Sequence, residues 1–584
     1  MIEKLSWDLS DIKCSEQDEQ QIVVCVSEFI EKYGANKLSI KNLQEAIIDY
    51  EKIGTKTAKL GSYAFLQLQT QIEDEEASKY FAKISEFLGG IAAKLAFFTV
   101  KILEFDIKKI KKKLKESKYL PWIENFFRYK DHFLTKEGEE VFVLKDETSS
   151  NTWVRLYDKI MSKAVFKLDG KEYTESEILQ IMSYDESANR RKAAAHALHT
   201  GLNDNMFNIE FIYNCIMLDV SVSRKIRKYN YPEDIMHAHN DIDKAAIDAM
   251  TDAVVANYSK TAHRYYKIKA KLLGYGDKIE YWDRNAAVKQ SKFLDRHFSY
   301  EESTNIVLST FGEFSPIFRK IAENFITQGW IDVMPKKGKR SGAFAHPCSV
   351  DTHQYIILNF FGKIRDVSTM AHELGHGIHM NLAAKKGTLL AETPLTLSEI
   401  ASIFCEKLVF EKLKKEAQTP AEKIDLLCMK LEDSINTIIR QVAFFNFERK
   451  AHKHRECGEL SSKDLSSIFL DTQRECLGPH VKVDDIVGNY WGYVSHFFHS
   501  PFYVYSYAFA EIMVVALYNF YKKVRNGEDF KEKYINMLSN GGAERYDIAL
   551  GKFNLDTQGK EFWDAGVKDI VNMIDELESL QNYI

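Results

Sequence analysis

The five residues 372–376, His-Glu-Leu-Gly-His, lie inside a segment with the apolar spacing of an α-helix, Ile364–Lys385. Residues four apart on a helix stand one above the other, about 6 Å along the axis. Two imidazoles placed in this way can reach one cation, at Zn–N distances of about 2.0–2.1 Å. A glutamate and two histidines in an otherwise apolar helix are costly to bury without a partner such as a metal. The motif therefore predicts a metal site.

The residues around the motif add detail to this prediction. Glu373 lies beside the histidine pair, where its carboxylate can take a proton from a water that the metal activates. Asp366 or Ser368 is expected to cap the start of the helix, and Gly387 stands just past its end. Chance is the competing explanation, because a chain with 17 histidines in 584 residues would contain such a motif roughly once in thirty.

Length and composition limit the class of protein. A chain of 584 residues is too long for one simple core, so two or more lobes are expected. Its net charge of -5 argues against a general nucleic-acid binder, and no uncharged apolar run reaches the roughly 18 residues that span a bilayer. The first residues lack the layout of a secretion signal, and the eight cysteines form no Cys-x-x-Cys pair. We expect a cytoplasmic monomer or small homo-oligomer with no nucleic-acid or membrane partner.

The distribution of prolines and glycines favours a mainly helical fold. Only nine prolines and 28 glycines interrupt long stretches rich in Lys, Glu, Leu and Ala. Between Thr135 and Tyr173 the pattern is less regular, and the segments FVLKD (142–146) and VFKLDGKEY (165–173) predict a small insert that contains strands. Helical apolar spacing occurs in three segments near the N-terminus: Ser15–Tyr33, Ile40–Glu51 and Asp74–Ala96.

A strand is predicted just before the motif helix, at Tyr355–Phe361. Such a strand can offer an edge to which an extended peptide adds its backbone hydrogen bonds. A wholly structural hairpin explains the same residues equally well. The residues alone do not decide between these two interpretations.

A catalytic zinc site needs a third protein ligand and one open coordination position. His379 is on the motif helix but lies two turns from His372, about 10 Å along the axis, so it cannot join both motif histidines around one ion. Two glutamates downstream are the candidates, Glu392 and Glu399.

The start of the next helix decides between these two glutamates. If Thr393-Pro394 begins that helix, Glu399 lies in its second turn, on the same face as Ser402 and Glu406. If Thr396 is the cap instead, Glu399 completes a capping box and has a structural role. Because proline suits the first helical position, we favour Glu399 as the third ligand.

The motif and its surroundings resemble the oligoendopeptidase F group of the thimet-oligopeptidase-like metallopeptidases. HELGHGIH is followed by TPLTLSEIASIF, with the Glu 23 positions after the second His. WDLSDI at Trp7–Ile12 is similar to the N-terminal signature of the group, and GAF with YIILNF resembles its substrate-side strand region. HFFHSPFYVYSYA, residues 496–508, is similar to its His- and Tyr-rich substrate loop. The resemblance covers most of the chain.

This resemblance implies a fold and an activity. Members of the group are mainly α, with two helical lobes around a deep central channel and a small β-sheet beside the zinc-binding helix. They are zinc-dependent endopeptidases that hydrolyse internal bonds of short unstructured oligopeptides. For this chain we expect an N-terminal helical region, residues 1–190, whose small insert at about 105–175 forms part of the channel wall, and a catalytic domain, residues 191–584.

The resemblance also implies the residues of the site. One zinc ion per chain (Zn2+) would be bound by His372, His376 and Glu399, and Glu373 would be the general base.

The loop near the C-terminus would contribute further groups. His496 and Tyr507 are expected to be catalytic, with Tyr507 facing the scissile carbonyl. Aromatic core packing is the competing explanation for this loop. Substrate contacts are expected from five other residues: Gly342, Ala343, Phe344, Tyr503 and Tyr505.

The chain departs from the usual pattern of the group at two places. His499 and Ser500-Pro501 replace a more aromatic stretch, and Cys405 stands where a small or amide residue is more usual. Two other functions stay open at this point, a helical zinc carboxypeptidase and a non-catalytic peptide-binding protein with a vestigial site. The intact Glu373 argues against the second, because a binding protein needs no general base.

Overall fold

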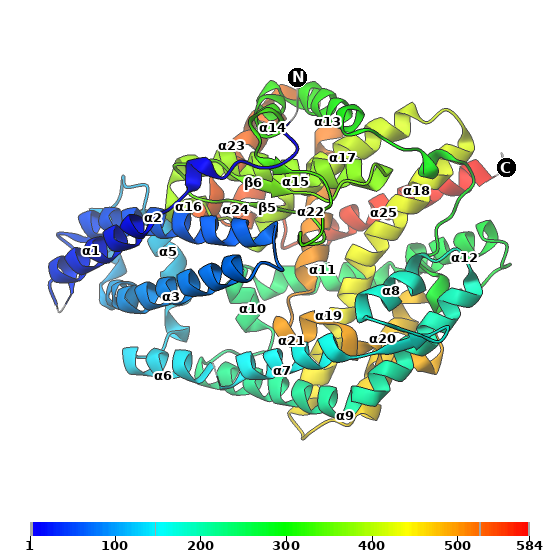
Figure 1. The fold of residues 1–584 in the computed structure, drawn as a ribbon, viewed down its shortest axis with the longest axis horizontal. Helices are drawn as coiled ribbons and strands as arrows, with labels where there is room; N and C mark the ends of the chain where they lie inside the picture. Colours follow the sequence, from blue (N-terminus) through cyan, green and yellow to red (C-terminus); the bar gives the residue numbers. More distant parts are fainter. Residues whose placement is uncertain (1–3, 35, 147, 525–526, 582–584) are drawn as a thin grey trace. The chain divides into compact units, whose positions relative to one another are not determined.

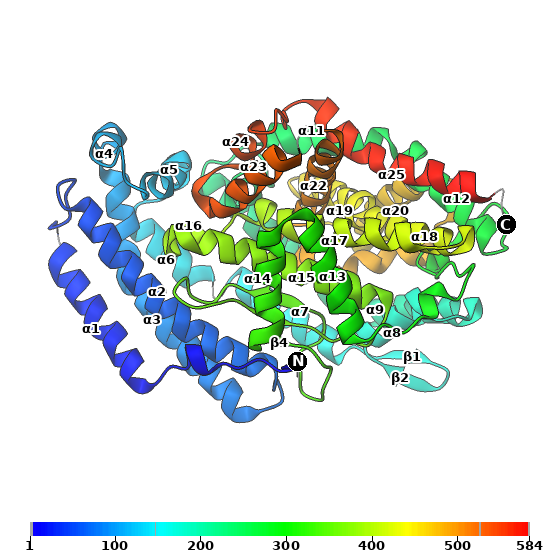
Figure 2. The same ribbon diagram turned by 90° about the horizontal axis from the view of Figure 1, so that it is seen from above.

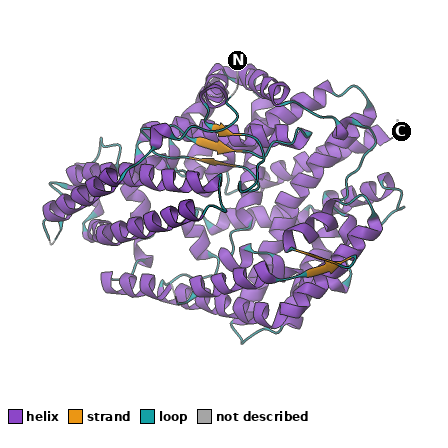
Figure 3. Cartoon of the chain, viewed as in Figure 1, coloured by secondary structure: helices purple, strands orange, loops and turns teal. Residues whose placement is uncertain are grey.

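The structure, a computed structural model, describes residues 4–34, 36–146, 148–524 and 527–581. Helices make up most of these residues and the strands are short (Figure 3). The prediction of a mainly helical fold is therefore confirmed. Within these ranges, no helix combines the length and the apolar character that a bilayer crossing requires.

The chain forms two compact units, as the expectation of two helical lobes requires. The first unit contains Met1–Lys130, Asp295–Glu416 and Tyr518–Asn554. The second contains Asp131–Leu294, Ala417–Leu517 and Leu555–Ile584. Neither unit is a continuous piece of chain, because each is assembled from three separate stretches.

The first unit holds the motif helix, α15, and an N-terminal group of helices. In this group α1, α2 and α3 lie side by side (Figures 1 and 2). Its helices are α1 (Glu16–Tyr33), α2 (Leu43–Gln69), α3 (Glu75–Glu104), α4 (Ile107–Lys113), α5 (Leu120–Arg128), α13 (Tyr300–Phe314), α14 (Pro316–Gln328), α15 (Ile364–Ala383), α16 (Thr388–Ala391), α17 (Leu395–Glu416), α23 (Gly527–Ser539) and α24 (Tyr546–Gly551).

The second unit is built around the long helix α9, which packs against α7 and α8. A π-helical turn, Ile435–Ile439, links α18 to α19. Its helices are α6 (Lys136–Asp146), α7 (Ser150–Lys163), α8 (Glu175–Tyr184), α9 (Ala188–Ile226), α10 (Asp234–His239), α11 (Lys244–Ala256), α12 (Ala262–Leu272), α18 (Pro420–Ser434), α19 (Arg440–Arg455), α20 (Ser462–Leu477), α21 (His496–His499), α25 (Lys560–Gln581) and the first part of α22 (Tyr505–Lys523).

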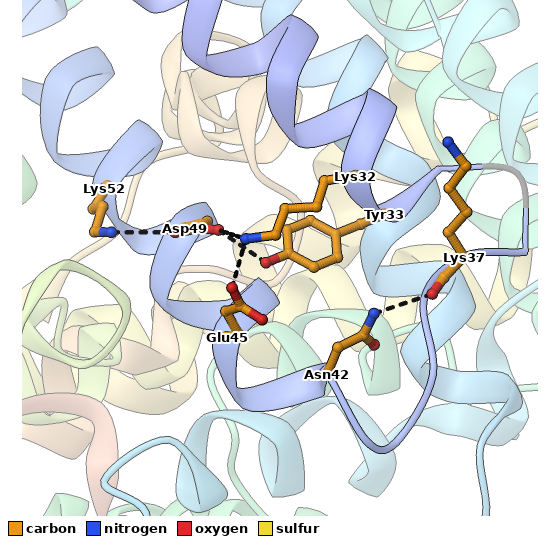
Figure 4. A network of polar contacts seen from close by, with 7 residues as sticks. All are labelled: Lys32, Tyr33, Lys37, Asn42, Glu45, Asp49 and Lys52. Carbon is orange, nitrogen blue, oxygen red and sulfur yellow. Dashed lines mark hydrogen bonds and ion pairs between the residues drawn. The ribbon is translucent and has the colours of Figure 1, made fainter.

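The helices α1 and α2 meet through an apolar core with a polar rim. Phe29 on α1 packs against Tyr50 on α2 and Phe98 on α3, with ring centroids 6.0 and 5.2 Å apart. At the surface, the Lys32 ammonium lies 2.6 Å from Glu45 and 3.2 Å from Asp49 (Figure 4). Exposed ion pairs of this kind contribute little to stability because solvent screens them, so the apolar core supplies most of the stability of this contact.

The irregular segment between Thr135 and Tyr173 is only partly as predicted. VFKLDGKEY forms a hairpin of β1 (Phe166–Leu168) and β2 (Lys171–Tyr173) around an Asp-Gly turn. FVLKD does not form a strand, because residues 142–146 are the end of helix α6. A short apolar run can belong to a strand or to a helix, and its five residues do not distinguish the two.

A three-stranded sheet lies against α15. Its central strand is β6 (Tyr355–Ile357), which pairs parallel with β4 (Ile331–Asp332) and antiparallel with β5 (Phe344–His346). Contacts of β5 and β6 with α15 confirm the predicted small sheet beside the motif helix. The prediction that Tyr355–Phe361 offers an edge is wrong, because β6 is paired on both sides and the outer strands are β4 and β5. Two further short strands, β3 (Ile279–Glu280) and β7 (Val481–Lys482), pair in the second unit.

The helices α15 and α17 approach each other closely at Gly375. A Cβ atom added at this residue would lie 2.6 Å from both the carbonyl oxygen of Ala401 and the Cα of Ser402. These are backbone atoms of α17, so they could move only if the whole helix moved. Glycine at position 375 is therefore a condition for the observed packing of the two helices.

We predict that Gly375→Ala destabilises the protein by about 1–3 kcal/mol, because the added methyl group overpacks a helix interface. Gly377→Ala is the matched control in the same helix. The atoms nearest to its Cβ would be those of the Phe325 ring, at 2.7 Å, and a side chain can shift more easily than the backbone of a helix. Thermal unfolding of both variants checks this, and equal melting temperatures would contradict it.

Candidate active site

Two helices bring the three predicted ligands together. His372 and His376 are one turn apart on α15, and Glu399 is on α17. The Nε2 atoms of His372 and His376 lie 3.4 and 3.3 Å from the Oε2 atom of Glu399. Among the described residues, these three alone form a group of His, Cys, Asp or Glu side chains whose possible ligand atoms all lie within 4.8 Å of one another.

The start of α17 explains how Glu399 reaches this position. The helix begins at Leu395, directly after Pro394. Thr396 is thus its second residue and is not its N-cap, so the capping-box alternative for Glu399 is wrong. The Glu399 carboxylate instead accepts a hydrogen bond of 2.7 Å from the hydroxyl of Ser402. Glu392 is exposed, precedes the helix and lies outside the group.

The start of α15 differs from the prediction. The helix begins at Ile364, so neither Asp366 nor Ser368 is its N-cap. Asp366 still stabilises this end, because its Oδ2 atom accepts hydrogen bonds from the backbone amides of Phe361 and Lys363, both at 2.9 Å. Gly387 follows the helix as predicted, after one 3₁₀ turn and with a φ of +89°.

The three side chains fit a zinc ion by distance and by type. Ligand atoms at about 2.0–2.2 Å from a tetrahedral zinc lie about 3.3–3.5 Å from each other. The separations of 3.3 and 3.4 Å between the imidazole nitrogens and the carboxylate oxygen agree with this. Two imidazoles and one carboxylate are also a ligand set of catalytic zinc sites.

Glu373 is buried beside the two imidazoles, with 6% of its surface exposed. Burial raises the pKa of its carboxyl group, while the nearby imidazoles of His372 and His376 oppose the shift, as does a backbone hydrogen bond from Ala345. Among the described residues its Oε2 atom has no hydrogen-bond partner. This carboxylate oxygen is therefore available to accept a proton from another molecule.

Glu406 is a part of this site whose role the sequence did not reveal. Its Oε2 atom lies 3.4 Å from the Nδ1 atom of His372, the ring nitrogen that does not face Glu399. A carboxylate at this place orients the ring and makes the other nitrogen a better ligand. The signal was visible, since Glu406 follows Glu399 by two helical turns on one face, but nothing distinguished it from other surface carboxylates.

His496 and two tyrosines form a cluster in the second unit. The Nε2 atom of His496 lies 3.1 Å from the Tyr507 hydroxyl. The His496 ring is stacked on Tyr503, with 5.7 Å between centroids and 9° between planes. Burial lowers the pKa of His496, and the charges of His499 and Arg440 act in the same direction. The imidazole is thus neutral near pH 7 and can donate from one nitrogen.

Tyr505 and His499 point elsewhere. Tyr505 is fully buried, and its hydroxyl accepts a hydrogen bond of 2.9 Å from Asn240 and lies 3.0 Å from His237. His499 is exposed and pairs with Asp158 at 2.8 Å. Neither residue belongs to the cluster of His496, Tyr503 and Tyr507.

The remaining predicted residues lie around α15. Gly342, with a φ of +81°, and Ala343 lead into the outer strand β5, which begins at Phe344. His379 is buried on α15, and burial lowers its pKa to about 4. Cys405 is fully buried on α17, where burial raises the pKa of its thiol. These last two residues therefore serve packing and lie outside the group of ligands.

Comparison with known proteins identifies relatives of this chain. The model of peptidase family M3 matches residues 181–569, and an oligopeptidase F model matches residues 101–166. An oligoendopeptidase F homolog of Lactococcus lactis is 26% identical, over 99% of this chain and 97% of that protein. Oligopeptidase PepF of Bacillus subtilis is 23% identical, over 98% of this chain and 87% of that protein. The crystal structure of oligoendopeptidase F from Enterococcus faecium superimposes with a TM-score of 0.72 at 18% identity, covering 97% of this chain and 99% of that one.

A helical protein that combines this motif on α15 with a glutamate on α17 has the site residues of a metallopeptidase. The family comparison makes the class specific. The chain belongs to peptidase family M3 and is a metalloendopeptidase.

We predict that Glu399→Ala loses its bound metal, because one of three protein ligands is removed. Glu392→Ala should keep its metal, since that side chain is exposed and outside the group. Metal analysis of both purified variants checks the assignment. Normal metal in the first together with lost metal in the second would refute it.

Proposed function

We propose that the chain is a zinc-dependent endopeptidase that hydrolyses internal bonds of short, unstructured oligopeptides. The observation that carries the proposal is the group of His372, His376 and Glu399 beside the buried carboxylate of Glu373. Membership of family M3 supports peptide hydrolysis, and the names of the relatives in Lactococcus lactis and Bacillus subtilis describe them as oligopeptidases.

In this proposal His372, His376 and Glu399 hold one zinc ion. When bound, zinc supplies a Lewis acid that polarises a water molecule and the scissile carbonyl. Glu373 accepts the proton of the attacking water and later passes it to the leaving amine. Its buried oxygen without a hydrogen-bond partner among the described residues supports this role, because the proton needs a free lone pair.

We further propose that Tyr507 and His496 donate hydrogen bonds to the substrate oxygen that gains negative charge. The contact of 3.1 Å between their side chains supports this, since each holds the other in place. Tyr503, stacked on His496, is proposed to contact the substrate. The buried hydroxyl of Tyr505 gives no support to a substrate contact, so that assignment stays a prediction.

The outer strand β5 is the proposed docking strand for the substrate backbone. Gly342, Ala343 and Phe344 stand at its start, and the strand pairs with β6 alone in the sheet. An extended peptide can add its backbone hydrogen bonds to such an outer strand.

The division into residues 1–190 and 191–584 and a deep channel that admits only short peptides are also proposals, based on the resemblance. A cytoplasmic location is proposed as well. It is supported by the eight cysteines, all of which are free thiols.

Cleavage of a peptide blocked at both ends tests the function. We expect the wild-type protein to cut this peptide at an internal bond, and a chelator to abolish the reaction. Glu373→Gln should retain metal and peptide affinity but lose about 10²–10⁴-fold in kcat, because only the proton acceptor is removed. Mass analysis of the products and metal analysis of the variant are the measurements.

Each alternative has its own outcome in this experiment. A carboxypeptidase would leave the blocked peptide intact and shorten the same peptide with a free C-terminus. A peptide-binding protein would bind both peptides and cut neither. Near-normal turnover by Glu373→Gln would rule out the proposed proton transfer.

Tyr507→Phe tests whether the Tyr507 hydroxyl donates a hydrogen bond to the substrate oxygen. The change removes one hydroxyl and little volume, so we expect a loss of about 2.7–4 kcal/mol in the barrier, seen mainly in kcat. Tyr490→Phe is the matched control: this buried tyrosine of the same unit donates to the carbonyl of Ala195 at 2.8 Å, so its loss should lower the melting temperature while kcat is retained. Full activity of Tyr507→Phe with a lowered melting point would remove Tyr507 from the catalytic residues.

A further inference from the structure

A tight turn joins α21 to α22 in the second unit. It comprises residues 500–503, and the backbone amide of Tyr503 donates to the carbonyl of Ser500 at 3.0 Å. Phe502 has a φ of +65°. Pro501 at the second position and a positive φ at the third define a type II turn, where the third position usually holds glycine or asparagine. A phenylalanine at this position needs other contacts to hold it.

Glu448 supplies such a contact. It is fully buried on α19, and its Oε1 atom accepts a hydrogen bond of 2.7 Å from the backbone amide of Phe502. The Phe502 ring packs beside His452, one helical turn further along α19, with 4.5 Å between centroids, and against Phe445 at 6.1 Å. The backbone and the side chain of Phe502 are thus both anchored to α19.

The other carboxyl oxygen of Glu448, Oε2, makes no hydrogen bond in the part of the chain that the structure describes. Burial raises the pKa of Glu448 well above its usual value; the Phe502 amide opposes this shift and the charge of Glu233 adds to it. Its Oε1 atom is the acceptor for the Phe502 amide. A glutamine amide offers the same acceptor in the same shape.

This hydrogen bond selects between two backbone conformations. Type I and type II turns have similar ends and differ by rotation of the peptide between the second and third residues by about 180°. In a type I turn the amide of Phe502 would point away from Glu448, and the φ of Phe502 would be negative. Removing the acceptor therefore removes the backbone contact that favours the type II conformation, while the packing of the Phe502 ring is kept.

The turn lies within the segment that carries the cluster of His496, Tyr503 and Tyr507. His496 precedes it, Tyr503 is its last residue, and Tyr507 follows one helical turn later. The stacking of His496 on Tyr503 and the contact between His496 and Tyr507 both depend on the chain direction through this turn. A rotated peptide next to Tyr503 would change both contacts.

We propose that Glu448 is a positioning residue for peptide hydrolysis. It holds the peptide before Phe502 in the type II orientation and so keeps His496, Tyr503 and Tyr507 in their mutual arrangement. This inference rests on the proposed roles of His496 and Tyr507. It does not require Glu448 to touch the substrate.

Two substitutions at one position separate the hydrogen bond from the packing. Glu448→Leu removes the acceptor at similar volume and should lower kcat by about 10–100-fold, with KM changed by less than about threefold. Glu448→Gln keeps the acceptor and should retain kcat within about threefold. Amide hydrogen exchange of a peptide that spans residues 500–504 should be at least about tenfold faster in the first variant and unchanged in the second.

Asp425→Leu is the matched control for loss of a buried acid. Asp425 is fully buried in the same unit and accepts the backbone amides of Gln290 and Ser291 at 2.6 and 2.9 Å. Its replacement should lower the melting temperature and leave the kcat of the folded enzyme unchanged. If Glu448→Leu does not fold, Pro501→Gly tests the same turn, because it weakens the preference for type II. Like Glu448→Leu, Pro501→Gly should lower kcat and make amide hydrogen exchange of residues 500–504 faster.

A double variant shows whether Glu448 acts through the cluster. Tyr507→Phe should lower kcat much less in the Glu448→Leu background than in the wild-type protein, since the first change has already displaced the hydroxyl. Unchanged kcat in Glu448→Leu, or a loss that adds in full to that of Tyr507→Phe, overturns the inference and leaves the role of Tyr507 intact. If Tyr507→Phe alone keeps full kcat, Tyr507 has no catalytic role. In that case His496→Ala replaces Tyr507→Phe in the double variant with Glu448→Leu, and a loss in kcat that adds in full to that of His496→Ala overturns the inference.

Discussion

The backbone contact between α15 and α17 at Gly375 is the constraint on which the site depends. Only a residue without a Cβ lets the carbonyl of Ala401 come so close. This approach places Glu399 within 3.4 Å of both motif imidazoles and Glu406 within the same distance of the other nitrogen of His372. The glycine of the motif is thus a part of the site, although it carries no side chain.

Three glutamates on helices show how burial and neighbours assign different roles to one residue type. Glu399 is partly exposed, and hydrogen bonds and charge from His372 and His376 hold its pKa well below the usual value, so it stays a carboxylate. Glu373 shares the same imidazoles but lacks their direct hydrogen bonds, and burial raises its pKa. Burial raises the pKa of Glu448 well above its usual value, and no cation is among the groups that shift it. The different partners of the three side chains, together with the partial exposure of Glu399, account for these different shifts.

The parts of the candidate site that could be predicted from the sequence are those that one spacing rule determines. The pairing of His372 with His376 and the choice of Glu399 follow from helical spacing and from Pro394. Features that depend on distant segments could not be predicted. The pairing of β6 on both sides requires the two-residue strand β4, which is too short to leave a pattern. Likewise, the burial of Tyr505 depends on Asn240 and His237, more than 260 positions away.

The discontinuous first unit has a consequence for synthesis of the chain. The helix α17, which carries Glu399, packs against α23. The Tyr534 hydroxyl on α23 donates to the carbonyl of Ile400 at 2.8 Å, and the Tyr534 ring lies 4.6 Å from the ring of Phe404. A nascent chain therefore exposes the whole metal motif long before the ribosome has added residues 518–554, which complete this core. The proteolytic centre therefore gains its full support only after this third stretch of the first unit has been synthesised.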